Sequence, residues 1–300
     1  MNLPAAVRIV EVGARDGLQN EPREIPLADK LRLLDDLALA GLTTIEAGSF
    51  VNPKWVPQMA DSDEVFAQLK RHAGVRYTAL TPNTKGVERA LAVGADEVAV
   101  FAAASETFSQ KNTNCSIAES LERIEAVMDL ARERDVRVRG YLSCTQGCPY
   151  EGDIAPAAVA DLTVQLLEMG CYEISLGDTI GRGNAGSTAR MLDALLPRVE
   201  TRQLAMHCHD TRGQALANIL VALQAGIATV DASVAGLGGC NYAPGASGNV
   251  ATEDVVYMLH GLDIATGIDL DLLIAAGEQI SNVLERRNAS SVALAMRGKG

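Results

Sequence analysis

The chain has 300 residues, 48% of them hydrophobic and 21% charged, and its formal net charge is −12. This is the composition of a globular protein with a sizeable core, and its acidic balance argues against general binding to nucleic acid or anionic membranes, which requires a basic surface. A small anionic ligand is still allowed, because a local group of Arg and Lys can outweigh the global charge. No apolar run approaches the roughly 18 residues of a membrane helix. We therefore expect neither nucleic-acid nor membrane partners.

The six cysteines are scattered along the chain and form no C-x-x-C pair. The N-terminal stretch MNLPAAVRIVEV has neither the apolar core of a secretory signal nor the Arg/Ser-rich composition of a transit segment. We therefore expect reduced thiols and a cytoplasmic location, not a disulfide scaffold. Cys144 and Cys148 have no second pair with which to hold zinc, so we interpret them as loop residues.

Four segments share one pattern, in which a helix-like stretch is followed by a glycine, a short loop and a β-branched residue. Before the first glycine, one helical face is formed by Leu27, Leu31, Leu34 and Leu37. The glycine suits the left-handed position that ends a helix, and the β-branched residue suits a strand. The four segments are GLTTIEA from Gly41, GADEVAV from Gly94, GCYEISL from Gly170 and GIATVDA from Gly226.

Extending this pattern along the chain predicts eight strands, most of them separated by helical patterns of about 10 to 15 residues. Eight such units favour an α/β fold, a (β/α)8 TIM barrel over about residues 7–262. An open doubly wound sheet is the alternative, but no G-x-G-x-x-G follows the first strand. The predicted strands are 7–12, 44–50, 76–82, 97–104, 137–143, 172–177, 203–209 and 229–235.

The segment after the barrel, IDLDLLIAAGEQISNVLERR, has the pattern of one further amphipathic helix. We expect it to lie outside the barrel, in a C-terminal extension over about 263–300. The chain shows no linker, so we predict one domain that spans residues 1–300.

The sequence HCHD, at the end of the seventh strand, is the sharpest chemical signal. Residues two apart in a strand face the same side, so His207 and His209 point together, as half of a metal site. Active sites of barrels lie at the carboxyl ends of the strands, and strands 1, 7 and 8 adjoin when the barrel closes. Asp16 and Asn249 can therefore supply oxygen ligands. Two nitrogens and two oxygens suit Mg²⁺ or Mn²⁺ and can accept Zn²⁺.

Three more charged residues follow or end strands near this position. Arg15 precedes Asp16 and can stabilise an enolate or carboxylate as its charge develops. Glu46 and Asp178 are acidic at positions where an unpaired charge is expensive to bury. We interpret them either as acid/base or supporting groups of the site, or as members of salt bridges inside the barrel.

With these residues in view, the sequence resembles the 3-hydroxy-3-methylglutaryl-CoA lyase family from about residue 7 to at least 260. The set of RDG-Q, H-x-H-D and a late Asn is shared with a wider metal-dependent superfamily that includes isopropylmalate and homocitrate synthases. The Gly-rich cysteine loop narrows the match to the lyase. The motifs are VEVGARDGLQNE, FVNPKWVPQM, GCYEISLGDTIG, HCHDTRGQALAN and SVAGLGGC.

The resemblance implies cleavage of an acyl-CoA substrate, 3-hydroxy-3-methylglutaryl-CoA, into acetoacetate and acetyl-CoA. It assigns Asp16, His207, His209 and Asn249 to a divalent cation, and Arg15, with Gln19, to the substrate. Cys240 is the implied catalytic thiol, on a mobile loop, and Glu46 and Asp178 match active-site acids of the family. We favour Cys240 as the proton shuttle, with His207 second. We also expect a homo-oligomer, most simply a dimer.

The chain departs from the family pattern at three places. Asn241 stands where the signature has proline, which removes a restraint on φ just after the cysteine. Pro22 and Arg23 follow RDGLQNE where some members have lysine, which can alter contacts with the phosphates of CoA. The tail SSVALAMRGKG has no cysteine, so we do not expect an intersubunit thiol switch.

Three other functions compete with this one. The first is the same cleavage of a longer 3-hydroxy-3-alkylglutaryl-CoA, since the sequence does not place the acyl pocket. The second is a condensing synthase, although such enzymes commonly carry a further C-terminal regulatory region. The third is a non-catalytic barrel, in which the Arg, Asp, His and Cys residues would be unused.

Overall fold

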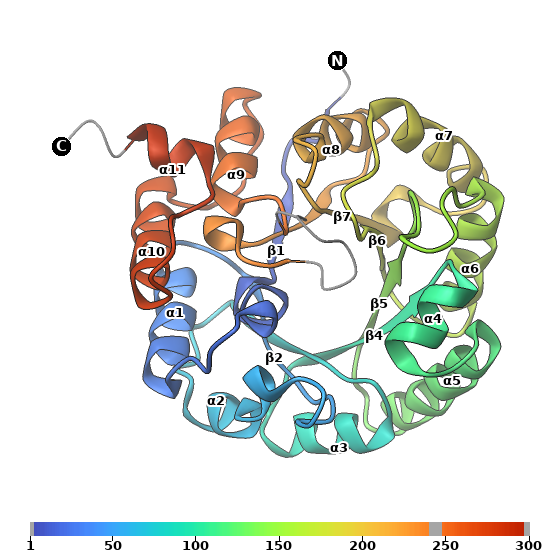
Figure 1. Cartoon of the computed structure of the whole chain (residues 1–300), viewed down its shortest axis with the longest axis horizontal. Coiled ribbons are helices and arrows are strands. Elements are labelled where there is room, and N and C mark those ends of the chain that lie inside the picture. Colours follow the sequence, from blue (N-terminus) through green and yellow to red (C-terminus); the bar gives the residue numbers. More distant parts are fainter. Residues whose placement is uncertain (1–2, 240–247, 297–300) are drawn as a thin grey trace.

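The structure is a computed structural model that describes residues 3–239 and 248–296. Eight parallel strands pair in chain order, and the last pairs with the first to close a barrel. Figure 1 looks along this barrel and shows the helices arranged around the strands. The (β/α)8 prediction is thus confirmed. The strands are β1 (Arg8–Glu11), β2 (Thr44–Ser49), β3 (Arg76–Leu80), β4 (Glu97–Ala103), β5 (Val138–Ser143), β6 (Ile174–Asp178), β7 (Leu204–Cys208) and β8 (Thr229–Ala232).

The outer layer consists of helices that alternate with the strands, and two further helices follow at the C-terminal end. Figure 1 shows α10 beside α1, so the C-terminal segment packs outside the barrel as predicted. The helices are α1 (Leu27–Leu39), α2 (Ser62–Gln68), α3 (Thr84–Ala92), α4 (Glu106–Thr113), α5 (Ile117–Glu133), α6 (Pro156–Glu168), α7 (Ala185–Leu195), α8 (Ala215–Gln224), α9 (Thr252–Gly261), α10 (Leu270–Val283) and α11 (Ser291–Met296).

The four glycines of the repeated pattern do end helices in the left-handed conformation, with φ between 80° and 114°. A side chain is disfavoured there, which explains the choice of glycine after α1, α3, α6 and α8. At Gly41 a Cβ would also lie 2.3 Å from the carbonyl oxygen of Gly267. At Gly41 the left-handed backbone conformation and the close packing against Gly267 thus both require glycine.

The main hydrophobic core lies between the strands and the surrounding helices. In α1 the fully buried leucines are Leu33, Leu34 and Leu37, while Leu27 and Leu31 lie at the edge of this face. The inside of the barrel is different, because it holds ion pairs and hydrogen-bonded polar side chains. This polar interior leads directly to the candidate site.

All eight predicted strands are present, but at one or both ends they differ from the predicted bounds by up to three residues. β8 ends at Ala232, because the following turn η5 (Val234–Gly236) places Ala235 at a left-handed φ of 56°. β7 ends at Cys208, and His209 instead forms an isolated antiparallel bridge with Asn249. The predicted C-terminal helix is α10, which ends at Val283 before Glu285 adopts a φ of 52°, and the further helix α11 follows it.

Candidate active site

The first part of the site is the turn after β1. Here the chain forms a five-residue π-helix, η1 (Gly13–Gly17), which is tied to the strand by a hydrogen bond from the backbone N–H of Gly13 to Oε1 of Glu11, at 2.8 Å. The turn carries Arg15 and Asp16 side by side, and both are largely shielded from solvent. Two adjacent residues therefore reach the same region, as the sequence indicated.

The second part is the end of β7 and the segment that returns after β8. The imidazole rings of His207 and His209 lie 5.4 Å apart, centroid to centroid. One ligand atom each from Asp16, His207 and His209 lie within 4.8 Å of one another. Among the described residues this is the only such group of three or more His, Cys, Asp or Glu side chains. Asn249 is beside them, since its Nδ2 donates to Oδ2 of Asp16 at 2.8 Å.

The chemistry of this group fits a divalent cation. Nδ1 of His209 is buried and has no hydrogen-bond partner in the described part of the chain. Burial and the neighbouring His207 lower the pKa of His209 to about 4, so its imidazole is neutral at pH 7 and has a lone pair to offer. Burial alone would raise the pKa of Asp16, but Arg15 and the two histidines lower it below its ordinary value. One carboxylate and two imidazoles are a typical donor set for such an ion.

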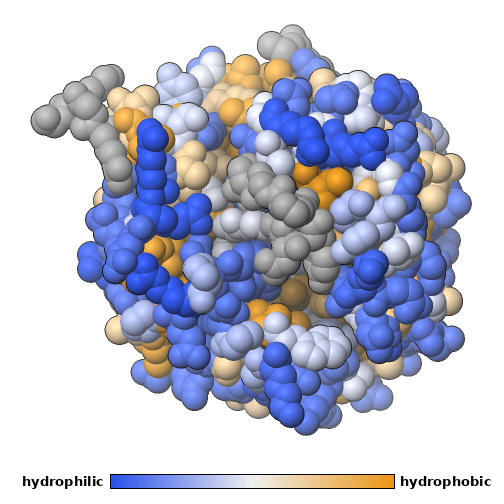
Figure 2. All heavy atoms as spheres, viewed as in Figure 1, coloured by the Kyte–Doolittle hydropathy of each residue, from blue (hydrophilic) through white to orange (hydrophobic). Residues whose placement is uncertain are grey.

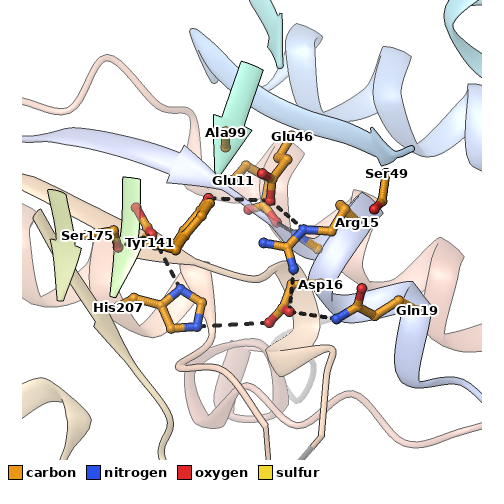
Figure 3. Close-up of polar contacts among 12 residues, drawn as sticks. Glu11, Arg15, Asp16, Gln19, Glu46, Ser49, Ala99, Tyr141, Ser175 and His207 are labelled. Carbon is orange, nitrogen blue, oxygen red and sulfur yellow. Dashed lines mark hydrogen bonds and ion pairs between the residues drawn. The ribbon is translucent and has the colours of Figure 1, made fainter. Parts of the chain in front are cut away.

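Arg15 lies between the candidate metal-ligand group, which consists of Asp16, His207 and His209, and the buried carboxylate of Glu46. Its Nε donates to Oε2 of Glu46 at 2.5 Å, and its Nη1 donates to Oδ1 of Asp16 at 2.6 Å. Figure 3 shows these contacts and places Tyr141 beside them. The phenol ring of Tyr141 lies 5.4 Å from the guanidinium carbon of Arg15, and its hydroxyl donates to Glu46 at 3.3 Å. Glu46 thus belongs to an ion pair that orients Arg15.

The sequence did not point to two further residues of the candidate site, Asp231 and Arg139. Oδ2 of Asp231 in β8 lies 3.3 Å from Nδ1 of His207, and the same carboxylate accepts from both terminal nitrogens of Arg139. Burial would raise the pKa of Asp231, but Arg139 and His207 outweigh it and hold this pKa below its ordinary value. The sequence signal that could have identified them is a charged residue within an otherwise apolar strand, Arg139 in RVRGYLS and Asp231 in TVDA.

A pair of buried glutamates holds the start of the glycine-rich loop. Glu11 accepts from the N–H of Val234 at 2.9 Å and from Oγ1 of Thr252 at 2.6 Å. Glu253 accepts from the N–H of Ala235 with both oxygens, at 3.0 Å. Burial raises the pKa of Glu11 to about 7 and that of Glu253 to about 8. The turn that carries Asp16 and the loop that leads to Cys240 are therefore fastened to the same carboxylate, Glu11.

The other predicted residues have different surroundings. Asp178 accepts from the backbone N–H groups of Arg182 and Gly183, at 2.9 and 2.8 Å, and so orders the loop after β6. Gln19 donates to Oδ1 of Asp16 at 3.0 Å. Arg23 pairs with Glu285 at 3.1 Å.

The predicted thiol, Cys240, and the departure at Asn241 lie outside the described residues. The loop ends that flank them are described. At the near end, a Cβ on Gly238 would lie 2.7 Å from Nδ2 of Asn249, so the two ends of the loop approach each other closely.

Figure 2 shows that hydrophilic residues predominate on the face of the molecule seen in Figure 1, with hydrophobic residues in small groups between them. None of the helices in the described part of the chain is long and apolar enough to cross a membrane.

The chain is similar to known proteins over its full length. It is 60% identical over 299 residues, 100% of both chains, to the 3-hydroxy-3-isohexenylglutaryl-CoA/hydroxy-methylglutaryl-CoA lyase of Pseudomonas aeruginosa. The crystal structure of hydroxymethylglutaryl-CoA lyase from Pseudomonas aeruginosa superposes with a TM-score of 0.98 at 60% identity, over 100% of both chains. An HMG-CoA lyase from Acinetobacter baumannii, in complex with coenzyme A and 3-methylmalate, gives a TM-score of 0.93 at 37% identity, over 97% of this chain and 95% of that one. Residues 6–280 match the HMGL-like family, and the chain belongs to that family.

Proposed function

We infer that this protein is a carbon–carbon lyase that cleaves 3-hydroxy-3-methylglutaryl-CoA into acetoacetate and acetyl-CoA. The observation that carries this conclusion is the meeting of Asp16, His207 and His209 with the buried guanidinium of Arg15 at one end of the barrel. The similarity to lyases of this name over the full chain supports the same reaction. The condensing synthase and the non-catalytic barrel explain these observations less well.

The reaction breaks the bond between C2 and C3 of the substrate. A base takes the proton of the C3 hydroxyl, the C3–O⁻ collapses to the ketone of acetoacetate, and the electrons of the broken bond pass to the enolate of acetyl-CoA. That enolate is then protonated at carbon. A divalent cation, when bound, would lower the pKa of the hydroxyl and offset the negative charge. We assign Mg²⁺ or Mn²⁺ to Asp16, His207, His209 and Asn249, whose oxygen and imidazole donors suit these ions.

Arg15 supplies the fixed positive charge that this reaction needs. Its guanidinium is held by Glu46 and Asp16, and these carboxylates outweigh burial and keep its pKa above the ordinary value. It therefore stays protonated while negative charge develops on the substrate oxygen. A positioned cation in a shielded site stabilises such charge without having to reorganise.

We assign the proton transfer to Cys240, with His207 as the second candidate. The five described cysteines are all buried, and burial raises the pKa of Cys171 to about 12 and that of Cys208 well above its ordinary value. Such thiols are poor proton carriers. The start of the loop that carries Cys240 is fastened by Glu11 to the turn that holds Asp16, which places the two segments in one unit.

The direct test is an assay of the purified protein with 3-hydroxy-3-methylglutaryl-CoA and Mg²⁺ or Mn²⁺, in which acetoacetate is measured. We expect turnover that a chelator abolishes and that re-added cation restores. Cys240→Ala is expected to lower kcat by about 10²- to 10⁴-fold, the usual contribution of one acid–base group. Cys115→Ala is the matched control, because this buried thiol contacts the hydroxyl of Thr113 at the end of α4, which is not a proposed site residue. Full activity of Cys240→Ala would reject the thiol assignment, and full activity of His207→Ala would reject the metal assignment.

A second candidate substrate has a longer alkyl group at C3. The observation in its favour is the 60% identity to a Pseudomonas aeruginosa protein named for both the isohexenyl and the methyl substrate. The test compares kcat/KM for 3-hydroxy-3-isohexenylglutaryl-CoA and 3-hydroxy-3-methylglutaryl-CoA with one enzyme preparation. Comparable values would establish dual specificity. Turnover of the methyl substrate alone would reject it, and turnover of the isohexenyl substrate alone would make that the physiological activity.

We further propose a cytoplasmic homodimer. Among the described residues, the free and buried cysteines Cys115, Cys148, Cys171 and Cys208 support a reducing compartment. Size-exclusion chromatography with light scattering tests the assembly, and a mass equal to that of one 31.6 kDa chain would reject the dimer.

A further inference from the structure

We propose that Asp231 is a positioning residue that fixes the tautomer of His207. In this arrangement Nδ1 of His207 carries the proton and donates it to Asp231, and Nε2 keeps its lone pair on the side of Asp16. Asp231 lies in β8 and His207 in β7, at positions directly paired across the two strands. The contact joins Nδ1 of His207 to Oδ2 of Asp231 at 3.3 Å, while Nε2 is 3.9 Å from Oδ2 of Asp16.

The geometry of Asp231 makes it an acceptor for His207. Arg139 donates from Nη2 to Oδ1 of Asp231 at 2.7 Å and from Nη1 to Oδ2 at 3.1 Å. Ser175 donates to Oδ2 at 2.6 Å. A carboxylate held in this way by a guanidinium and a hydroxyl is an anion that offers lone pairs only. The nitrogen of His207 that faces it must therefore be the protonated one. Figure 3 shows the imidazole of His207 facing Asp16 with one of its edges.

Asp231 is itself fixed by a column of alternating charges inside the barrel. Nε of Arg139 donates to Oε1 of Glu173 at 2.8 Å, and Arg8 at the start of β1 pairs with Oε2 of Glu173. Arg139, Glu173 and Asp231 are almost completely buried, so this column is rigid and is not screened by solvent. The ring of Tyr141 meets the imidazole of His207 edge-on at 6.0 Å and restricts its rotation. A histidine held in this way presents a single nitrogen to a ligand.

The column also suggests a purely structural role for Asp231, and the two roles differ in what they predict. A structural ion pair would matter only for stability. A positioning residue also determines which nitrogen of His207 is free, and hence how tightly the site binds a cation. Loss of such a supporting partner typically weakens metal affinity about 10- to 100-fold.

The experiment uses the full chain with 15N-labelled histidine, in EDTA at a pH where imidazole is neutral. The chain has four histidines, so the His207 signals can be assigned with a His207→Gln variant. We expect wild-type His207 to be protonated at Nδ1. Asp231→Asn should give a mixture of tautomers or the Nε2–H form, and Mn²⁺ affinity, measured by electron paramagnetic resonance of free Mn²⁺, should fall about 10- to 100-fold.

The matched control is Glu173→Gln, which disturbs the same column on the far side of Arg139 and has no contact with His207. We expect it to lower the melting temperature but to leave the His207 tautomer and the Mn²⁺ affinity unchanged. Equal effects of Glu173→Gln and Asp231→Asn on the tautomer would overturn the proposal. Nε2–H in the wild-type protein would also overturn it, and that measurement requires no variant to fold.

The proposal rests on the proposed function only in assigning His207 to the cation. Neither the tautomer nor the Mn²⁺ affinity depends on the substrate. A protein that shows both expected changes but does not cleave 3-hydroxy-3-methylglutaryl-CoA would reject the proposed function and leave the role of Asp231 intact.

Discussion

Arg15 and Glu46 form a buried ion pair in which Nε of the guanidinium lies 2.5 Å from Oε2 of the carboxylate. The same guanidinium reaches Asp16 through Nη1, so it spans two carboxylates with two different nitrogens. This bridge requires the planar fork of arginine, because a lysine ammonium is a point charge on a flexible chain. The guanidinium that we propose to face the substrate is therefore joined both to Glu46 and to the proposed metal ligand Asp16.

Arg15→Lys should keep the positive charge and lose the bridge. We expect kcat/KM for 3-hydroxy-3-methylglutaryl-CoA to fall by about 10²- to 10³-fold, as when one oriented transition-state donor is removed. Mn²⁺ affinity should change much less, since the ligands themselves are retained. Arg132→Lys, on an exposed part of α5, is the matched control and should behave like the wild type. Activity of Arg15→Lys close to that of the wild type would contradict the requirement for a fork.

Asp16→Asn should remove the anionic ligand of the proposed site while keeping the shape of the side chain. Replacing a negative charge by an amide lowers cation affinity, and the loss should exceed the roughly 10- to 100-fold effect of losing a supporting partner. Gln19→Ala is the comparison, because it removes only one hydrogen bond from an uncharged amide to the Asp16 carboxylate, worth about 1.5–3 kcal/mol. Calorimetric titration with Mn²⁺ measures both. Equal affinities of the two variants would argue against Asp16 as a ligand.

Glu253 should make stability depend on pH in the neutral range. Its pKa is about 8 in the folded protein against an ordinary value of 4.5, so between these values the folded state binds more protons than the unfolded state. The free energy of unfolding then decreases as the pH rises from about 5 to 8. Glu253→Gln mimics the protonated form and can still accept from Ala235. At pH 8.5 in EDTA it should be more stable than the wild type by about 1–2 kcal/mol, and at pH 5 nearly equal to it.

Urea denaturation of both proteins at several pH values measures this difference. Glu11, whose pKa is raised to about 7, is present in both proteins and its charge helps to raise the pKa of Glu253, so the comparison measures Glu253 together with its coupling to Glu11. Parallel pH profiles for the two proteins would show that Glu253 does not titrate in this range.

The barrel could be predicted from the sequence because its repeated signal has a local cause. A glycine that ends a helix needs only its own backbone conformation, and the four repeated glycines all have positive φ. The grouping of Asp16, His207 and His209 was also accessible, since strand alternation and closure of the barrel bring the three together. These inferences required no knowledge of side-chain partners.

The missed features depend on partners that are distant in the chain. The carboxylate of Asp231 is held by the guanidinium of Arg139, 92 residues away, and no local sequence pattern specifies that contact. The early end of β8 has a similar cause, because the left-handed Ala235 is held by Glu253, 18 residues further on. Asp178 differs from these two, because its carboxylate accepts from the backbone N–H groups of Arg182 and Gly183, only four and five residues further on.

Two neighbouring glycines in the loop allow a sharp test of how its near end supports the site. Gly238 has a φ of 130°, and a Cβ there would lie 2.7 Å from Nδ2 of Asn249. For Gly239 the nearest atom of a described residue to a Cβ is Cβ of Asn20, at 3.8 Å, which is ordinary contact. The same substitution at the two positions therefore differs mainly in its effect on Asn249.

Gly238→Ala should displace the amide of Asn249 from Asp16 and strain the backbone, at a cost of about 1–3 kcal/mol. Since Asn249 is a proposed ligand, we expect Mn²⁺ affinity to fall about tenfold, which corresponds to about 1.4 kcal/mol. Gly239→Ala should retain the affinity of the wild type, because its new methyl group meets no atom of the site. Mn²⁺ titrations of both variants decide the question. If Gly238→Ala bound Mn²⁺ as tightly as Gly239→Ala, the close approach of Gly238 to Asn249 would have no bearing on the metal site, and Asn249 would be a support of the loop and not a ligand.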